Sequence, residues 1–586
     1  MPLPVCVPVT PVEKSHFGVT MAAAPVRTVE GFHKALLVAS RTDGACVGDV
    51  ELCADYAERA MTLSRRDLLK MGVLAGAAVG LPLQRGASAD SPSQNRLAAS
   101  LLPRPFTVPF SVPDLLVPLR ADATTDHYRV IMQPFPAQIL PGFTTPLWGY
   151  NAQVPGPTVR IQRGRRAVIR QVNALPAQHP ALGYTPWTSV HLHGSPSAPQ
   201  YDGYASDITN PGQYKDYRYD NLQPSRTLWY HDHGVHHTAE NVLMGLAAQY
   251  HLIDPADQAL HLPTGPYDMP LTVADAMFTA DGGLLFDNHD ETGMFGDVIL
   301  VNGRPWPVLQ VARRKYRFRI LNASVTRSYA WSLDSGEPMT IIATDAGLMP
   351  FPQQVLSFRH APAERYEVVI DFSRYPIGRR VVLGNTSPKN NIDYDNTDQI
   401  MAFDVVGADF DPADNAVPEA LNPNGDVMAL TEQLAVATVQ LNLVRQHGKW
   451  TINGHTWDDV VASGFRLVET TATRGDVVIF ELRNTSGGWF HPVHVHAIDF
   501  KILDRNGAPP MPHERGPKDV VYLGENETVR VITRFDVTGT YMMHCHNLVH
   551  EDHDMMSQFR VLNPDGSTGT DPLSEPALPL PETGQP

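Results

Sequence analysis

A short stretch near the end of the chain, YMMHCHNLVHEDHDMM, gathers side chains that bind soft metal ions. Cys545, His550 and Met555 supply a thiolate, an imidazole and a thioether at five-residue steps. With one more imidazole they would complete a trigonal site of two histidines and one cysteine with a weak axial methionine, which suits an electron-transfer copper ion. We therefore expect a redox-active copper site in this stretch.

Two further histidines, His544 and His546, flank Cys545. Residues 529–543 before them alternate as in a strand, where successive side chains point to opposite faces. His544 and His546 would then face one way and Cys545 the other. One tripeptide would thus join two metal sites through a few covalent bonds. The competing interpretation is that these residues occupy ordinary core and surface positions and bind no metal.

Other histidine pairs share this spacing, and they make the packing interpretation harder to sustain. The three pairs are His191 with His193, His231 with His233, and His494 with His496, and His491 lies just upstream of the last. Within a pair, two residues of strand rise by roughly 7 Å, so both imidazoles lie on one face and can bind adjacent metal ions. If His491 completes the cysteine site, eight imidazoles remain. Imidazole ligation suits copper better than calcium or magnesium, and zinc has no use for a redox-tuned thiolate.

Three copies of one β-sandwich unit are predicted to position these clusters. A similar turn and strand begins at evenly spaced positions, 151 residues apart, at Asn151, Asn302 and Asn453. A second shared segment follows each copy, and in the middle copy Tyr316, Phe318 and Ile320 alternate with arginines, the period of a half-buried strand. The fold class expected is all-β, with three Greek-key sandwich domains.

The domain boundaries follow from the repeats and from composition. We expect domains over residues 98–255, 256–410 and 430–562, with a linker at 411–429 rich in Pro, Asp and Asn. The middle domain carries no histidine pair and is interpreted as a spacer. The tail at 563–586 is rich in Pro, Ser and Thr and is expected to be disordered. Its LPETG sequence looks like a sortase signal, but no apolar segment follows it, so chance or an added tag is favoured over anchoring.

Residues 61–89 resemble a twin-arginine export signal. Arg65-Arg66 precede an apolar run at 71–83 and a small-residue cleavage site at Ala87-Ser88-Ala89. The run is too short for a mature membrane span. We expect export by the Tat machinery to the periplasm or the medium, without stable membrane insertion. Because such signals open a chain, residues 1–60 are interpreted as an unstructured or non-native extension and Met61 as the start; a short buried helix in a cytoplasmic protein is the alternative.

Cleavage near Ala89 would leave Cys545 as the only cysteine, because the other three lie at Cys6, Cys46 and Cys53. A disulfide framework is then impossible, and a metal ligand or a nucleophile is the natural role for the remaining thiol. The formal net charge of −16 argues against nucleic acid as a partner. The 51 prolines and 43 glycines suit a loop-rich exported β protein.

Long segments around these clusters resemble the multicopper oxidases, and among them the bilirubin oxidases and spore-coat laccase-like enzymes. They include VHLHGSPSAPQYDGYASDITNPGQYKDY, LWYHDHGVHHTAEN, DYDNTDQIMAF, GWFHPVHVHAIDFKI, GPKDVVYLG and HCHNLVHEDHDMM, and the resemblance covers about residues 110–562. It implies cupredoxin-like domains and four copper ions. The type 1 ion would be bound by His491, Cys545, His550 and Met555, with Met556 as the competing axial residue. The type 2 ion would be bound by His191 and His494, and the type 3 pair by His193, His231, His233, His496, His544 and His546.

The resemblance also implies an activity. A copper-dependent oxidoreductase would take single electrons from phenolic, aromatic or tetrapyrrole reductants at the type 1 ion and reduce dioxygen to water at the other three. That reduction consumes protons, and Asp202 and Glu551 match family acids that deliver them. A solvated loop position, or the orientation of a ligand histidine, is the competing interpretation of both acids. Trp489 matches a residue at the rim of the type 1 site, or else belongs to the core.

Three alternative functions can be weighed against the sequence, and one of them is excluded. A metallo-oxidase of Cu(I) or Fe(II) would share the ligands but usually carries a methionine-rich segment, whereas the methionines here are scattered. A copper-free cupredoxin scaffold is disfavoured because all twelve ligand positions are filled. The three repeats exclude a two-domain nitrite reductase. We expect a monomer whose partners are dioxygen and small aromatic reductants.

Overall fold

The computed structural model describes residues 95–581 apart from 388–390, 408–412 and 423–424. The predicted extension at 1–60 and the predicted signal at 61–89 lie outside the described residues, as do the last three residues of the LPETG sequence. All described residues belong to one compact unit, Ala89–Pro586. Strands dominate it, and they form three pairs of sheets, one pair for each predicted repeat.

The first domain packs a mostly antiparallel sheet against a four-stranded one around the buried Val130, Trp148 and Tyr250. The first sheet runs β2 (Arg120–Ala121), β3 (Thr125–Ala137), β6 (Arg166–Asn173), β8 (Gln213–Tyr219) and β33 (Leu578–Pro579), with β4 (Thr145–Tyr150) paired to β3. The second runs β5 (Val159–Gln162), β10 (Ala247–Ile253), β9 (Arg226–Asp232) and β7 (Val190–His193).

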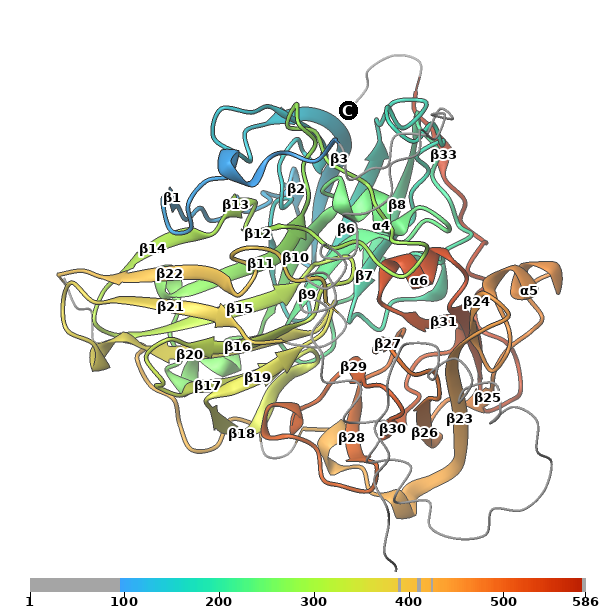
Figure 1. Ribbon diagram of the computed structural model, residues 1–586. Helices are drawn as coiled ribbons and strands as arrows, with labels where there is room; N and C mark the ends of the chain where they lie inside the picture. The colour runs from blue at the N-terminus through green and yellow to red at the C-terminus, as the bar shows by residue number, and fades with distance from the viewer. Residues whose placement is uncertain (1–94, 388–390, 408–412, 423–424, 582–586) are drawn as a thin grey trace, which may run out of the picture. The chain divides into compact units, whose positions relative to one another are not determined.

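The second domain, green to yellow in Figure 1, has the largest sheet. That sheet runs β13 (Arg304–Pro305), β12 (Val298–Val301), β11 (Asp268–Ala276), β15 (Lys315–Asn322), β20 (Arg365–Asp371), β17 (Met339–Thr344) and β18 (Gly347–Val355). The other runs β1 (Val108–Pro109), β14 (Pro307–Val311), β22 (Gln399–Val405), β21 (Arg380–Asn385), β16 (Tyr329–Leu333) and β19 (Ser357–His360). Because β1 pairs with β14, a segment expected in the first domain forms an edge of the second.

The third domain, orange to red in Figure 1, has two five-stranded sheets. One runs β24 (Lys449–Ile452), β23 (Ala435–Gln446), β26 (Val477–Asn484), β30 (Thr528–Arg534) and β28 (Phe500–Arg505). The other runs β25 (Thr471–Thr473), β32 (Met556–Leu562), β31 (Gly539–Cys545), β27 (His491–Val495) and β29 (Val520–Leu523). Alternation positions the core: Val478, Phe480 and Leu482 of β26 point between the sheets, while Val477 and Ile479 pack on the opposite face.

The three evenly spaced asparagines have one structural role. Asn151, Asn302 and Asn453 all adopt a left-handed backbone conformation, with φ of 56°, 49° and 53°. Each side-chain oxygen accepts a hydrogen bond of 2.8 or 2.9 Å from a backbone N–H of a neighbouring strand. Asparagine tolerates this conformation better than most residues. The sequence repeat therefore reflects a structural turn that each domain needs.

The expectation of a disordered tail was wrong for residues 563–581. β33 pairs antiparallel with β8 of the first domain, and Figure 1 shows the two side by side. Tyr201 Oη donates a 2.7 Å hydrogen bond to Glu575 Oε1. An edge strand offers unpaired backbone groups to any segment that reaches it, so a tail of low hydrophobicity can be ordered by a distant domain.

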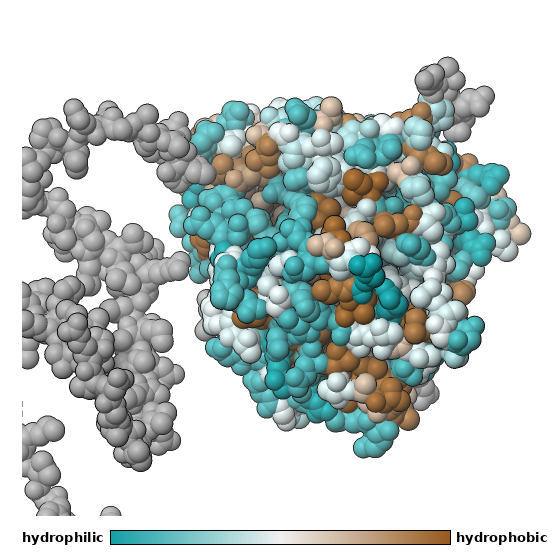
Figure 2. Space-filling model, turned by 90° about the vertical axis from the view of Figure 1, so that its right-hand side faces the viewer, coloured by the Kyte–Doolittle hydropathy of each residue, from teal (hydrophilic) through white to brown (hydrophobic). Residues whose placement is uncertain are grey.

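In the described part of the chain, none of the helices has both the length and the apolar character needed to cross a bilayer. On the face shown in Figure 2, hydrophobic residues form separate patches among polar ones.

Candidate metal centres

The structure brings His491, Cys545 and His550 together inside the third domain. Cys545 Sγ lies 3.4 Å from His491 Nδ1 and 3.6 Å from His550 Nδ1, and all three side chains are fully buried. His491 begins β27, Cys545 ends β31, and His550 lies on the short helix α6 (Leu548–Asp552), which Figure 1 shows next to β31. Asn547 caps that helix by accepting a hydrogen bond from the Val549 N–H.

Met555 and Met556 occupy different surroundings. Met555 is buried in the same apolar cluster as Cys545, and its carbonyl accepts a 3.1 Å hydrogen bond from the Cys545 N–H. Met556 packs instead in a separate cluster with Tyr204 and Trp457. The packing therefore favours Met555 as the axial neighbour of the cysteine.

The eight remaining histidines gather where the first and third domains meet. Their ligand atoms form three sets, each within 4.8 Å: His193, His231 and His546; His233, His496 and His544; and His191, His494 and His496. None of these eight side chains is more than 1% exposed. Strand pairing creates the arrangement, because His191 lies opposite His231 in the β7–β9 pair and His494 opposite His544 in the β27–β31 pair. His544 and His546 point away from the Cys545 cluster, as strand alternation predicts.

Unpartnered imidazole nitrogens show that these residues fit metal ions. Buried nitrogens without a hydrogen-bond partner include Nε2 of His191, His231 and His494, Nδ1 of His193, and both nitrogens of His546. On three of these rings the opposite nitrogen is anchored to a backbone carbonyl, at 2.5 Å for His191, 2.7 Å for His231 and 2.8 Å for His494. Metal-binding histidines have this arrangement, and a metal would satisfy atoms that are costly to bury alone.

Burial also sets the protonation state of these rings. It lowers the pKa of His191, His231 and His494 well below the usual value for histidine, and it lowers that of His233 to about 4. Removing an imidazolium from water disfavours the charged form. The rings are therefore neutral near pH 7, which is the form that binds metal ions.

Both predicted acids lie against ligand-type histidines. Asp202 Oδ2 accepts a 2.8 Å hydrogen bond from His496 Nδ1, while Asp202 Oδ1 is buried without a hydrogen bond and lies 3.6 Å from His191 Nδ1. Glu551 Oε2 lies 2.8 Å from His544 Nδ1, and its Oε1 lies 3.5 Å from His233 Nδ1. Both carboxylates are almost fully buried, so neither occupies a solvated loop position.

The Cys545 site is covered by tryptophans and by a loop of the second domain. Trp450 stacks on the His550 ring with centroids 3.6 Å apart, and the half-buried Trp489 meets it edge-on at 5.8 Å. His550 Nε2 lies 3.2 Å from the Thr292 carbonyl oxygen. Trp450 Nε1 donates a 2.9 Å hydrogen bond to the Glu291 carbonyl. The outward edge of His550 is therefore closed by backbone of residues 291–292.

Comparison with known proteins identifies this arrangement. Three family models, each described as multicopper oxidase, match residues 132–256, 255–399 and 440–565. The chain belongs to the multicopper oxidases. It is 40% identical to a bilirubin oxidase of Albifimbria verrucaria over 501 residues, which covers 80% of this chain and 84% of that protein. It is 32% identical to a laccase of Bacillus subtilis (strain 168) over 518 residues, which covers 78% of this chain and 99% of that protein.

A solved structure agrees on the fold. The laccase of Pediococcus acidilactici superposes with a TM-score of 0.67 at 29% identity and covers 79% of this chain and 95% of that one. This multicopper oxidase is accordingly a copper-dependent oxidoreductase that uses oxygen, built from cupredoxin-like β-sandwich domains.

Two residues next to the histidines were missed by the sequence analysis. Asp519 precedes β29 and contacts both His193 and His494, and Arg365 of the second domain pairs with Asp519. The segment GPKDVVYLG, which contains Asp519, is one of those that resemble the family, but its spacing carries no ligand pattern. Arg365 has no local signal at all, because its role depends on contacts between domains.

Proposed function

We propose that this multicopper oxidase takes single electrons from phenolic, aromatic amine or tetrapyrrole compounds and uses them to reduce dioxygen to water with four copper ions. The observation that carries the proposal is the position of Cys545. Its side chain lies with His491 and His550, while the residues on either side of it, His544 and His546, each complete one set of three imidazoles. Electrons collected at one centre would reach the other through this short covalent connection.

The ligand assignment follows the geometric sets. His491, Cys545, His550 and Met555 would hold the type 1 ion, and His191 and His494 the type 2 ion. The type 3 pair would be held by His193, His231 and His546 on one side and by His233, His496 and His544 on the other. Bound copper supplies the one-electron redox changes that carry electrons from a reducing substrate to dioxygen.

The protein residues would supply binding, orientation and protons. Asp202 would orient His496 through Oδ2 and hold a transferable proton on Oδ1, which has no hydrogen-bond partner. Glu551 would orient His544 and His233 from the other side. Separate centres would keep reactive oxygen species away from oxidised organic substrate, because the eight imidazoles of the oxygen-reducing centre are buried, none more than 1% exposed.

The cover over His550, formed by Trp450, Trp489 and the backbone of residues 291–292, supports outer-sphere oxidation of organic molecules. Since the Thr292 carbonyl closes the His550 edge, a substrate would deliver electrons through the cover without binding the metal. Such transfer needs only surface contact and a suitable potential, which fits a broad class of aromatic reductants. Relatives named bilirubin oxidase and laccase support the same class.

An exposed acidic side chain in this cover favours a second candidate function. Glu291, whose side chain is 43% exposed, sits directly beside Thr292 and would attract a cationic reductant such as Fe(II) or Cu(I). It is already 3.3 Å from Arg445, which weakens that attraction. Oxidation of these metal ions is therefore the alternative function.

Oxygen uptake by the copper-loaded chain starting near Asp90 distinguishes the candidates. Bilirubin, a methoxyphenol and Cu(I) are compared at equal concentrations, with Cys545→Ser as a control that lacks the blue absorption. Faster uptake with the organic compounds supports the proposed function. A strong preference for Cu(I) would instead assign a metal-oxidising role.

Export and assembly are part of the proposal. The twin-arginine pattern at residues 61–89 supports transport by the Tat machinery to the periplasm or the medium, and we propose a monomer after cleavage near Ala89. N-terminal sequencing of the exported protein and its elution on size exclusion test both points. An exported protein that still carries residues 61–89 would contradict the proposed cleavage.

A further inference from the structure

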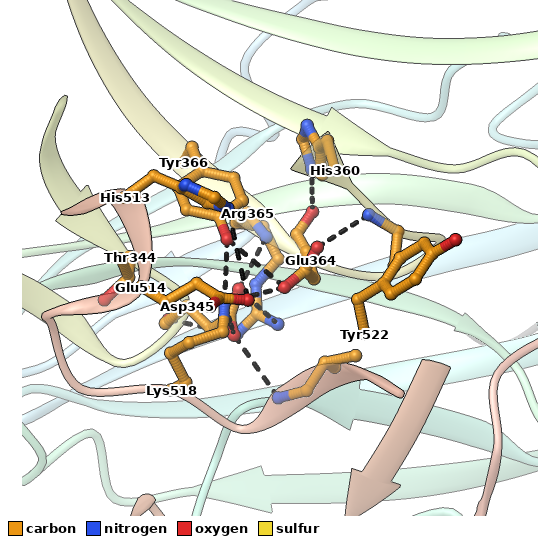
Figure 3. A network of polar contacts seen from close by, with 12 residues as sticks. Thr344, Asp345, His360, Glu364, Arg365, Tyr366, His513, Glu514, Lys518 and Tyr522 are labelled. Carbon is orange, nitrogen blue, oxygen red and sulfur yellow. Dashed lines mark hydrogen bonds and ion pairs between the residues drawn. The ribbon is translucent and has the colours of Figure 1, made fainter. Parts of the chain in front are cut away.

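A buried cluster of charges lies where the second and third domains meet (Figure 3). Lys518 Nζ lies 2.9 Å from Asp345 Oδ2 and 2.9 Å from Glu364 Oε1. Asp345 also accepts a 2.7 Å hydrogen bond from the Arg365 N–H. None of these side chains is more than 1% exposed. Burial of charges at this depth is costly unless each is paired, so the cluster holds its members in fixed positions.

Arg365 extends this cluster towards the histidines. Its guanidinium forms a two-point pair with Asp519, with Nη1 2.6 Å from Oδ1 and Nη2 2.5 Å from Oδ2. Nε donates a 3.0 Å hydrogen bond to the Thr227 carbonyl of β9. A planar guanidinium bound at both ends has one orientation. One side chain of the second domain thus connects the first domain and the third.

Asp519 in turn contacts two histidines of the trinuclear site. Its Oδ1 lies 3.2 Å from His193 Nε2, and its carbonyl accepts a 2.8 Å hydrogen bond from His494 Nδ1. With Nε2 engaged, His193 directs Nδ1 inward, and that atom is buried without a partner. His231 and His494 instead direct Nε2 inward. His193 therefore needs its own partner to fix its ring orientation and tautomer.

The backbone beside His193 is shaped to admit the ion pair. Gly194 has a φ of +87°, and a Cβ placed there would lie 2.6 Å from Arg365 Nη2 and 2.7 Å from Asp519 Oδ2. Any side chain would collide with the pair. Asp519 is close enough to His193 and His494 to be considered a metal ligand itself. Both of its carboxylate oxygens, however, are occupied by the guanidinium.

We propose that Arg365 is a positioning residue for the trinuclear copper site. It holds the Asp519 carboxylate where it accepts the His193 Nε2–H, so that Nδ1 faces the metal. The second domain, which the sequence suggested was a spacer, thereby contributes to copper binding in a site built by the other two. This inference rests on the proposed assignment of His193 as a copper ligand.

Substitutions test whether Arg365 orients the Asp519 carboxylate or only balances its charge. Arg365→Lys keeps the positive charge but loses the planar two-point contact, and Asp519→Asn keeps the size of the side chain while losing its charge. Arg319→Lys is the matched control. Arg319 is also buried in the second domain, binds Asp268 at two points and contacts Thr227 Oγ1, but none of its partners is a predicted ligand.

The measurements are copper content per chain, the blue absorption of the type 1 ion, and the electron paramagnetic resonance signal of the type 2 ion. Arg365→Lys and Asp519→Asn should retain the blue absorption but bind trinuclear copper 10- to 100-fold more weakly, the usual effect of removing a group that orients a ligand. Arg319→Lys should retain the full copper content.

The outcomes separate this inference from the proposed function. If Arg365→Lys and Asp519→Asn bind all copper as tightly as the wild type, or if they and Arg319→Lys all lose both centres together, the positioning role is wrong. A wild-type chain that binds no copper would overturn the proposed function itself. Arg365→Gln is not decisive, because it leaves a buried carboxylate unpaired and threatens folding.

Discussion

At the scale of single residues, Asp202 is positioned for both of the roles that the sequence left as alternatives, the orientation of ligands and the proposed delivery of protons. Its Oδ2 and its carbonyl are committed to His496 and His191, so it orients two ligands. Its Oδ1 is buried without a hydrogen-bond partner, 3.6 Å from His191 Nδ1, and burial raises the pKa of Asp202 well above the usual value for aspartate. A carboxyl that orients with one oxygen can therefore carry a proton on the other.

Asp202→Asn separates these roles, because the amide oxygen can still accept the hydrogen bond from His496 but the side chain carries no transferable proton. We expect the blue absorption to persist and its anaerobic bleaching by substrate to keep its rate. Reoxidation by dioxygen should slow by about 100-fold, the lower end of the range for losing a proton-transfer group. Stopped-flow absorbance measures both half-reactions. Loss of the blue absorption would refute a purely proton-transfer role.

Cys545 gives a second prediction at this scale. Burial raises the pKa of its thiol far above the usual value, and the thiolate is the reactive form. In the copper-free chain starting near Asp90 this thiol is the only one, so alkylation at pH 7 should be very slow until the protein is unfolded in urea. Mass spectrometry after treatment with iodoacetamide measures the difference. Rapid labelling of the folded chain would show that the site is open.

At the scale of elements, local patterns were predictable and contacts between domains were not. The opposite orientation of Cys545 and its flanking histidines follows from the period of a strand, which is a local property. Nothing local indicates that β1 joins the second domain, that β33 joins the first, or that Arg365 reaches Asp519. These contacts depend on the packing of segments between 154 and 364 residues apart, as in the Arg365–Asp519 and Leu578–Tyr214 pairs.

The role of β33 is open to a direct test by truncation. Ending the chain at Ser574 removes β33 and the Tyr201–Glu575 hydrogen bond. At about 1 kcal/mol for each of a few hydrogen bonds, thermal unfolding should begin roughly 2–6 °C lower. The blue absorption should not change. Ending the chain at Pro581 is the control, because it leaves β33 complete. Equal melting temperatures for both truncations would mean that the strand adds no stability.

At the scale of the whole molecule, the chain folds around many neutral imidazoles, and the copper-free form should be sensitive to acid. Burial lowers the pKa of His233 and His513 to about 4 and that of His360 and His491 to about 3. In the unfolded chain these groups would titrate near 6.5. Below that pH the unfolded state binds more protons than the folded state, so stability falls as the pH falls.

The expected size of this effect makes it measurable. Each such histidine contributes about 1.4 kcal/mol per pH unit between its folded and unfolded pKa values, so four contribute about 5 kcal/mol per unit between pH 6 and pH 4. Asp232 and Asp519, whose pKa values burial raises to about 7 and about 6, act in the opposite direction, as do Asp202 and Asp552, whose pKa values are raised well above the usual one. The described histidines with lowered pKa values, which also include His191, His193, His231, His494, His496, His546 and His550, are more numerous. Urea unfolding of the copper-free chain at pH 7.5, 6.5 and 5.5 should therefore show a midpoint that is steady at first and then falls. A midpoint that rises on acidification would mean that the buried carboxylates, and not the histidines, control the stability of the copper-free fold.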